Sequence, residues 1–100
     1  MDEDSGTGNY LLRSCQAEMD SAGKDRFTDT TQAYYAGYCL GIVKGTSLTT
    51  RVCTPDGVTV LQATRVVFKY LNDHPAQLHL PEVELIEEAL SKAFPCEKKP

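Results

Sequence analysis

The sequence predicts a small all-α domain, and three observations lead to this fold class. The chain has 100 residues, of which 41% are hydrophobic and 24% charged, the balance of one folded globular domain. Several stretches place apolar residues at helical spacing, whereas none alternates apolar and polar residues over the length of a strand. The four cysteines favour cross-links that stiffen a core of this size. We expect a bundle of four main helices cross-linked by two disulfides, with room for an extra short helix at residues 47–53.

The bundle is expected to occupy residues 9–96 as a single helical domain. Residues 1–8 are acidic and rich in Gly and Ser, which is typical of a disordered arm, and residues 97–100 are expected to form a flexible tail. The first helix begins at Asn9, a suitable N-cap, and ends near Asp20. Its apolar face carries Leu11, Leu12, Cys15 and Met19.

A second helix follows the polar loop 21–26, with Thr28 or Asp29 as its cap. Small residues recur along this helix at intervals of four, although interior glycines disfavour an isolated helix. We interpret the stripe as a surface that another backbone can approach closely. Alternatively, the helix stops at Gly41 or Gly45. The stripe consists of Ala33, Gly37, Gly41 and Gly45, and the inward face of Tyr35, Cys39, Ile42 and Val43.

Two further helices follow the break at residues 54–57. The third is expected to run from a Thr59 cap to about Asn72, and the fourth to start with Pro81 in its first turn. Acidic residues early in the fourth helix favour the positive end of its dipole. The inward faces consist of Leu61, Thr64, Phe68 and Leu71 in the third helix and of Val83, Ile86, Leu90, Ala93 and Phe94 in the fourth.

The cysteines allow three pairings, and the expected helices discriminate between them. Cys39 and Cys53 would lie about 20 Å apart along a continuous helix, beyond the limit of about 7 Å between bridged Cα atoms. Antiparallel packing of the first two helices brings Cys15 closer to Cys39 than to Cys53. We therefore expect Cys15–Cys39 and Cys53–Cys96, with the crossed pairing as the alternative. Two bridges indicate an oxidising compartment, and four reduced core thiols in a cytosolic protein are the competing interpretation.

The sequence contains little that supports catalysis or nucleic-acid binding. Acidic residues outnumber basic ones 14 to 10, unlike the basic surfaces that neutralise phosphates. His74 and His79 lack the helical spacing of a zinc pair, and the adjacent Glu87 and Glu88 diverge on their helix. No stretch is apolar enough over about 20 residues to cross a membrane. We predict a protein-binding domain without enzymatic activity, cofactor or metal, and without a nucleic-acid or membrane partner.

Three stretches carry a set of motifs that point to one family. They are G-N-Y-L-L-R-S-C at 8–15, G-Y-C-L-G-I-V-K-G at 37–45, and residues 53–96, in which C-T-P-D-G, Q-A-T-R-V-V, K-Y-L, H-P, L-H and F-P-C occur in this order. In these motifs the chain resembles the Rap/Tai family of type VI secretion immunity proteins. The resemblance implies a periplasmic, homodimeric protein that binds and occludes a peptidoglycan amidase delivered as a toxin by neighbouring cells. If the protein is exported, we expect that its leader has been removed from this form of the chain.

A projecting loop is the expected means of inhibition, because loops can enter a catalytic cleft. Two loops are available, at residues 72–80 and 54–57, and the second is tied down by Cys53. We favour the first. Alternatively, His74, Pro75 and Leu78 merely shape the hairpin. The expected partner-binding residues are Asn72, Asp73, His74, Gln77 and His79 in the turn, with Arg65 and Lys69 at the rim.

The main alternative function is a small periplasmic stress chaperone that exposes apolar surface in acid and binds unfolded proteins. The two expected disulfides argue against such loosening. An enzyme acting on cell-wall material would need a polar cleft, and the candidate residues above do not assemble one.

Overall fold

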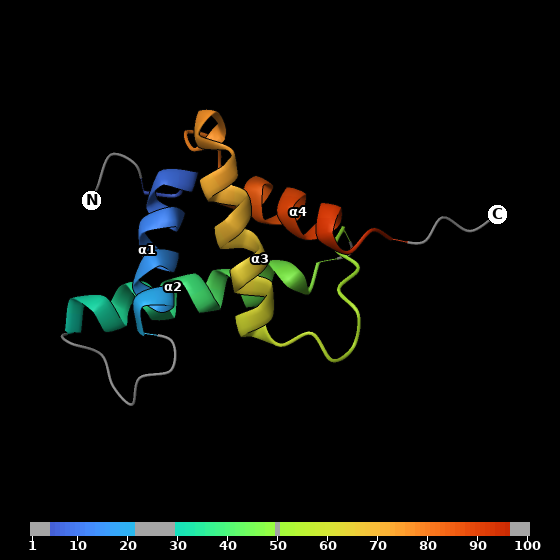
Figure 1. The fold of residues 1–100 in the computed structure, drawn as a ribbon, viewed down its shortest axis with the longest axis horizontal. Coiled ribbons are helices and arrows are strands. Elements are labelled where there is room, and N and C mark those ends of the chain that lie inside the picture. The colour runs from blue at the N-terminus through green and yellow to red at the C-terminus, as the bar shows by residue number, and fades with distance from the viewer. Residues whose placement is uncertain (1–4, 22–29, 50, 97–100) are drawn as a thin grey trace.

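The computed structural model describes residues 5–21, 30–49 and 51–96 (Figure 1). The expectations for the acidic arm, for the cap at Thr28 or Asp29 and for the C-terminal tail lie partly or wholly outside these residues. The four expected helices are confirmed, and the described residues contain no strand. They are α1 (Gly8–Ser21), α2 (Thr30–Ser47), α3 (Val60–Asp73) and α4 (Glu82–Ala93), and a 3-10 helix, η1 (Pro75–Gln77), lies between α3 and α4.

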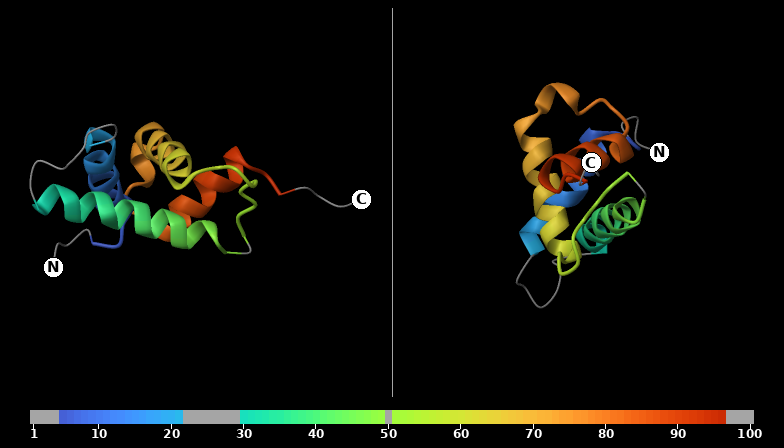
Figure 2. Two further views of the ribbon diagram at one scale, coloured as in Figure 1. Left: turned by 90° about the horizontal axis from the view of Figure 1, so that it is seen from below. Right: turned by 90° about the vertical axis from the view of Figure 1, so that its right-hand side faces the viewer.

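The helices are arranged so that α2 lies across α1 and α3 at a steep angle (Figures 1 and 2). Helices α1 and α3 stand side by side and run in opposite directions, while α4 packs against α2 and α3. The antiparallel packing expected for the first two helices is therefore wrong. The extra short helix is η1 and does not lie at residues 47–53, where only Ser47 is helical in the described part of the chain.

Side chains from all four helices form one core. Most of the residues expected to point inward are buried or half-buried, and Arg65 and Lys69 are exposed as expected. The fourth helix differs, because Val83 is 44% exposed and lies away from the face that carries Leu85 and Ile86. Ala93, at the end of the same helix, is also exposed. The largest fully buried side chains are Leu11, Leu71, Ile86, Leu90, Val43 and Val67.

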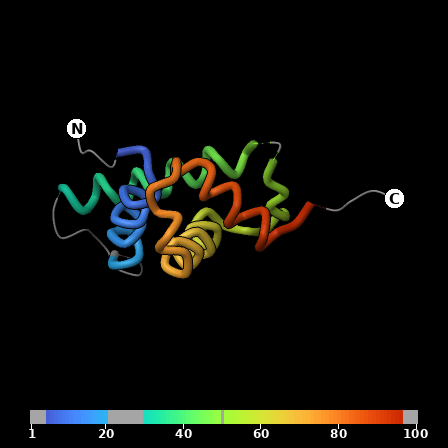
Figure 3. The backbone as a smooth tube through the Cα atoms, turned by 90° about the horizontal axis from the view of Figure 1, so that it is seen from above, coloured from blue at the N-terminus to red at the C-terminus, as the bar shows by residue number. Residues whose placement is uncertain are grey.

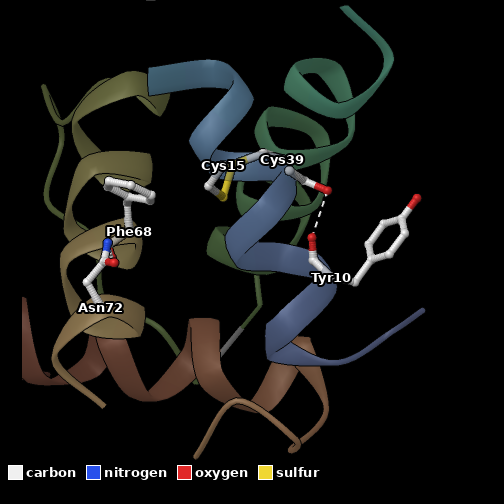
Figure 4. Close-up of a disulfide and its surroundings, with 6 residues drawn as sticks. Tyr10, Cys15, Cys39, Phe68 and Asn72 are labelled. Carbon is white, nitrogen blue, oxygen red and sulfur yellow. Dashed lines mark hydrogen bonds between the residues drawn. A yellow bond between two sulfur atoms is a disulfide. The ribbon is translucent and has the colours of Figure 1, made fainter. Parts of the chain in front are cut away.

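Both expected disulfides are present, with 5.1 Å between the Cα atoms of each pair. Cys15–Cys39 joins α1 to α2 where the two helices cross (Figure 4), so the pairing is right although the helices are not antiparallel. These two cysteines are fully buried, whereas Cys53 and Cys96 are exposed. The first bridge therefore belongs to the core, and the second closes the open end of the α3–α4 hairpin at the surface.

The segment around the start of α1 and the turn before α4 exchange backbone hydrogen bonds. The N–H of Gly8 donates to the oxygen of Leu80 and that of Glu82 donates to the oxygen of Gly6, each at 2.9 Å. Each segment thereby satisfies a donor that the other helix start leaves free, and Figure 3 shows the two segments side by side. A Cβ atom at Gly8 would overlap the end of the Leu85 side chain and approach the backbone oxygen of Leu78 to 3.0 Å, so a side chain here would have to displace its neighbours and glycine is favoured. The paired segments, residues 6–9 and 78–82, are called the strap below.

A buried carboxyl group lies within the strap. Glu82 is only 6% exposed; its Oε1 accepts a hydrogen bond from the hydroxyl of Tyr38 on α2, and its Oε2 has no hydrogen-bond partner in the described part of the chain. Burial raises the pKa of Glu82, and the hydrogen bond from Tyr38 offsets part of that rise. Burial also raises the pKa of Tyr38, as does its bond to the carboxylate. The hydrogen bond between Tyr38 and Glu82 thus joins α2 to α4 at a carboxyl group that is removed from water.

Removing the exposed bridge is expected to cost less stability than removing the buried one. The double substitution C53A/C96A should lower the free energy of unfolding by on the order of 3 to 4 kcal/mol, because mainly loop closure is lost. C15A/C39A loses a similar closure contribution and also the packing of two buried sulfur atoms, so its loss should be larger. Urea unfolding followed by circular dichroism measures both. An equal or reversed order would contradict the assignment of Cys15–Cys39 to the core.

Glu82→Gln is expected to stabilise the protein near pH 7. Because the folded pKa of Glu82 is raised above the unfolded value near 4.5, the folded state binds the proton more tightly, and stability falls as pH rises between the two values. Glutamine keeps an oxygen for the Tyr38 hydroxyl and cannot ionise. The gain, measured by urea unfolding across this window, should vanish below pH 4.5. Glu84→Gln, at an exposed position in the same helical turn, is the control. A stability gain of Glu82→Gln that persists at all pH values would refute the explanation by the raised pKa of Glu82.

Candidate functional site

The turn between α3 and α4 projects from the bundle (Figure 1, orange). It comprises the end of α3, η1 and the residues that enter the strap. Pro75 and Ala76, at the tip, are exposed, and so is His79 further along. The expected candidate loop is therefore an accessible projection whose second half is tied to the start of α1.

Tyr70, a buried residue of α3, holds the turn in shape. Its hydroxyl donates to Oε1 of Gln77 at 2.9 Å, and its ring stacks on the imidazole of His74 with 4.0 Å between ring centroids. Nδ1 of His74 lies 2.8 Å from the backbone oxygen of Tyr70, and as the donor of this bond it carries the proton. His74 and Gln77 thus come together around one aromatic ring, and both support the shape of the turn.

Asn72 and Asp73 are exposed and have partners on α3. Nδ2 of Asn72 donates to the backbone oxygen of Phe68, one turn earlier in α3, at 3.0 Å. Nζ of Lys69 lies 2.9 Å from Oδ2 of Asp73. Because this ion pair is exposed, it contributes little to stability and leaves both charges accessible to a partner.

The remaining predicted site residues lie outside the cluster around Tyr70. Arg65 and His79 are exposed, and within the described residues neither side chain forms a hydrogen bond or an ion pair. Lys69 borders a shallow groove of about 260 Å³ between α3 and α4, together with Asp73 and His74. The structure therefore joins Lys69 to the turn and leaves Arg65 further along α3.

A pocket that sequence reasoning did not predict lies beside the turn, against the start of α4. Its volume is about 280 Å³, and its lining combines apolar side chains with two carboxylates. The four-residue spacing of Glu84 and Glu88 predicts that they share a helix face, but nothing in the sequence indicates that the turn folds beside them. This α4 pocket is lined by Tyr70, Gln77, Leu80, Glu84, Leu85 and Glu88.

The chemistry of this region is that of a binding surface, with an apolar lining, a rigid aromatic and exposed charges. In residues 5–21, 30–49 and 51–96, no three His, Cys, Asp or Glu side chains gather as ligands for a metal ion. None of the helices described combines the length and the apolar character that a membrane crossing demands.

Comparison with known proteins identifies the family. The family model of the Rap1a immunity proteins matches residues 7–96, which include all four helices, both disulfides and the projecting turn. No curated protein matches the chain. The resemblance that the sequence motifs indicated is thereby confirmed. The chain belongs to the Rap1a immunity protein family, and its role is that of an immunity protein that binds a secreted effector protein.

Proposed function

We propose that this protein acts in the periplasm and neutralises a peptidoglycan amidase delivered by type VI secretion, by occluding the active site of that enzyme without catalysing a reaction itself. Family membership supports the immunity role. The two disulfides support an oxidising compartment outside the cytoplasm. The amidase as target is carried over from the motifs that resemble the Rap/Tai family.

The observation that carries the proposal is the fixed shape of the projecting turn. Tyr70 binds His74 and Gln77 on the inner side of the turn, and the strap holds its second half. A loop that is already ordered loses little conformational entropy when it docks, so more of the contact energy is retained as affinity. Such a loop is suited to entering a cleft and remaining there.

We propose two different roles for the predicted partner-binding residues. His74 and Gln77 shape the turn, while Asn72, Asp73 and His79 present polar groups to the effector. Arg65 and Lys69, both exposed on α3, contribute positive charge at the rim.

Enlarging the tip of the turn is expected to weaken inhibition while leaving the fold intact. Ala76 is exposed, so Ala76→Trp should fold normally and weaken binding by about tenfold or more through steric exclusion from the cleft. The measurement is peptidoglycan hydrolysis by a purified type VI amidase effector, with binding measured by calorimetry. Asp56→Trp in the loop 54–57 is the matched control.

Each outcome of this experiment is informative. If the unmodified protein neither binds nor inhibits the amidase, the proposed function is wrong. If Asp56→Trp abolishes binding and Ala76→Trp does not, the other loop enters the cleft.

The protein is also proposed to form a homodimer through the outward face of α2. Tyr34 is 60% exposed and Leu48 73% exposed, and a Cβ atom added at Gly37, Gly41 or Gly45 would meet no atom within 4 Å. The three glycines of the stripe therefore have open space beside them in the described part of the chain. Gly37 and Gly45 are placed symmetrically about Gly41, as are Tyr34 and Leu48, so two antiparallel α2 helices would place Tyr34 against Leu48 of the partner subunit across a two-fold axis.

Gly41→Leu is expected to separate the dimer into folded monomers. The new side chain has open space in the monomer, and replacing a helical glycine stabilises the helix by up to about 1 kcal/mol. At a close helix contact the same side chain would force the backbones apart. Sedimentation velocity and thermal unfolding measure both effects, with Gln62→Leu on α3 as the control. A Gly41→Leu protein that remains dimeric would exclude this interface.

A further inference from the structure

We propose that the α4 pocket receives an arginine side chain of the effector and so acts as a specificity pocket beside the inhibitory turn. This inference rests on the proposed function, because it assigns a contact within the complex. It is carried by the chemistry of the pocket, which has an apolar floor and two carboxylates at its mouth.

The floor of the pocket is apolar and fixed in shape. Leu85 is 2% exposed and Tyr70 8% exposed, and Leu80 is half-buried. The hydroxyl of Tyr70 is held by Gln77 at 2.9 Å, which fixes the position of the ring. Such a floor suits the three methylene groups of an arginine stem, whose burial is favourable while the charged head remains at the rim.

The mouth of the pocket is negatively charged. Glu84 and Glu88 lie one helical turn apart on α4 and are both exposed. They also border an adjoining hollow of about 440 Å³ that Glu87 and Arg51 line as well, with 3.8 Å between Nη1 of Arg51 and Oε1 of Glu87. Within the described residues Glu84 has no ion-pair partner, so its carboxylate is accessible to an external cation. An anionic or purely apolar occupant would meet unfavourable charge or leave these carboxylates desolvated without a partner.

A cation of the molecule itself lies beside the pocket, on the groove between α3 and α4. Nζ of Lys92 lies 3.3 Å from Oε1 of Glu88 and 5.5 Å from the centre of the Tyr70 ring. The same carboxylate and the same aromatic ring therefore attract positive charge in the free protein. Arginine fits the pair of carboxylates better than lysine, because its planar guanidinium donates in two directions and stacks on an aromatic surface.

The pocket can be tested without the effector. The probe is Nα-acetyl-arginine methylamide, titrated into the full chain and followed by NMR through the signals of Tyr70, Leu80 and Leu85. Nα-acetyl-citrulline methylamide, which has nearly the same shape and no charge, is the comparison ligand. We expect saturable shifts at these residues with the arginine probe and only weak shifts with the citrulline probe.

Three variants make the test specific. The double substitution E84Q/E88Q should weaken binding of the arginine probe by about fivefold, as expected for two partly exposed charge pairs. Lys92→Gln should strengthen it, because Glu88 loses its internal partner. Asp56→Asn, which removes one negative charge from the loop 54–57, should leave binding of the arginine probe unchanged apart from a weak long-range electrostatic effect.

Absence of saturable shifts, equal binding of the two probes, or unchanged binding to E84Q/E88Q would each overturn the pocket assignment. The inhibition assay separates this outcome from failure of the proposed function. If the protein inhibits the amidase but does not bind the probe, only the pocket assignment is refuted. If it binds the probe but does not inhibit the amidase, the pocket assignment stands and the amidase as target is refuted.

Discussion

Backbone hydrogen bonds between residues 6–9 and residues 78–82 hold the first helix, the projecting turn and the last helix in one arrangement. Helix starts carry unsatisfied N–H groups, and here two helices satisfy each other's donors without a capping side chain. The arrangement leaves little room for a side chain at position 8, and it holds the buried Glu82 against Tyr38 of α2. The shape of the turn therefore depends on a segment that precedes it by some seventy positions in the sequence.

Stiffness is the property that connects this fold to its role. The core bridge fixes α1 to α2, the surface bridge closes the α3–α4 hairpin, and Tyr70 shapes the turn from within. An inhibitor that loses little freedom on docking retains its contact energy as affinity. The same rigidity keeps Glu84 and Glu88 at a constant position beside the turn, so the proposed recognition pocket and the proposed inhibitory turn are held in fixed register.

Local sequence patterns predicted the helices well. Packing angles and the burial of particular side chains depend on tertiary contacts and could not be predicted from these patterns. The helix bounds and the exposed Arg65 and Lys69 follow from periodicity. The limited reach of a cysteine side chain excluded Cys39–Cys53, but the choice between the other pairings rested on an antiparallel packing that the structure does not have, so the two disulfides were predicted correctly on an incomplete argument. The crossing of α1 and α2 was not predicted, because periodicity carries no packing angle. The burial of Glu82 and the exposure of Val83 were missed because both depend on what covers the start of α4. The α4 pocket was missed for the same reason, since the turn beside it is placed by the strap.

The contrast in exposure between the two bridges implies an order of oxidation as the chain matures. Cys15 and Cys39 are sealed from solvent in the finished protein, so a disulfide-forming enzyme must reach them while α1 and α2 are still accessible, before α3 and α4 settle. Cys53 and Cys96 remain exposed and can be joined, opened and joined again after the rest of the chain is folded. A thiol reductant would therefore act on one end of the hairpin and leave the helix crossing untouched.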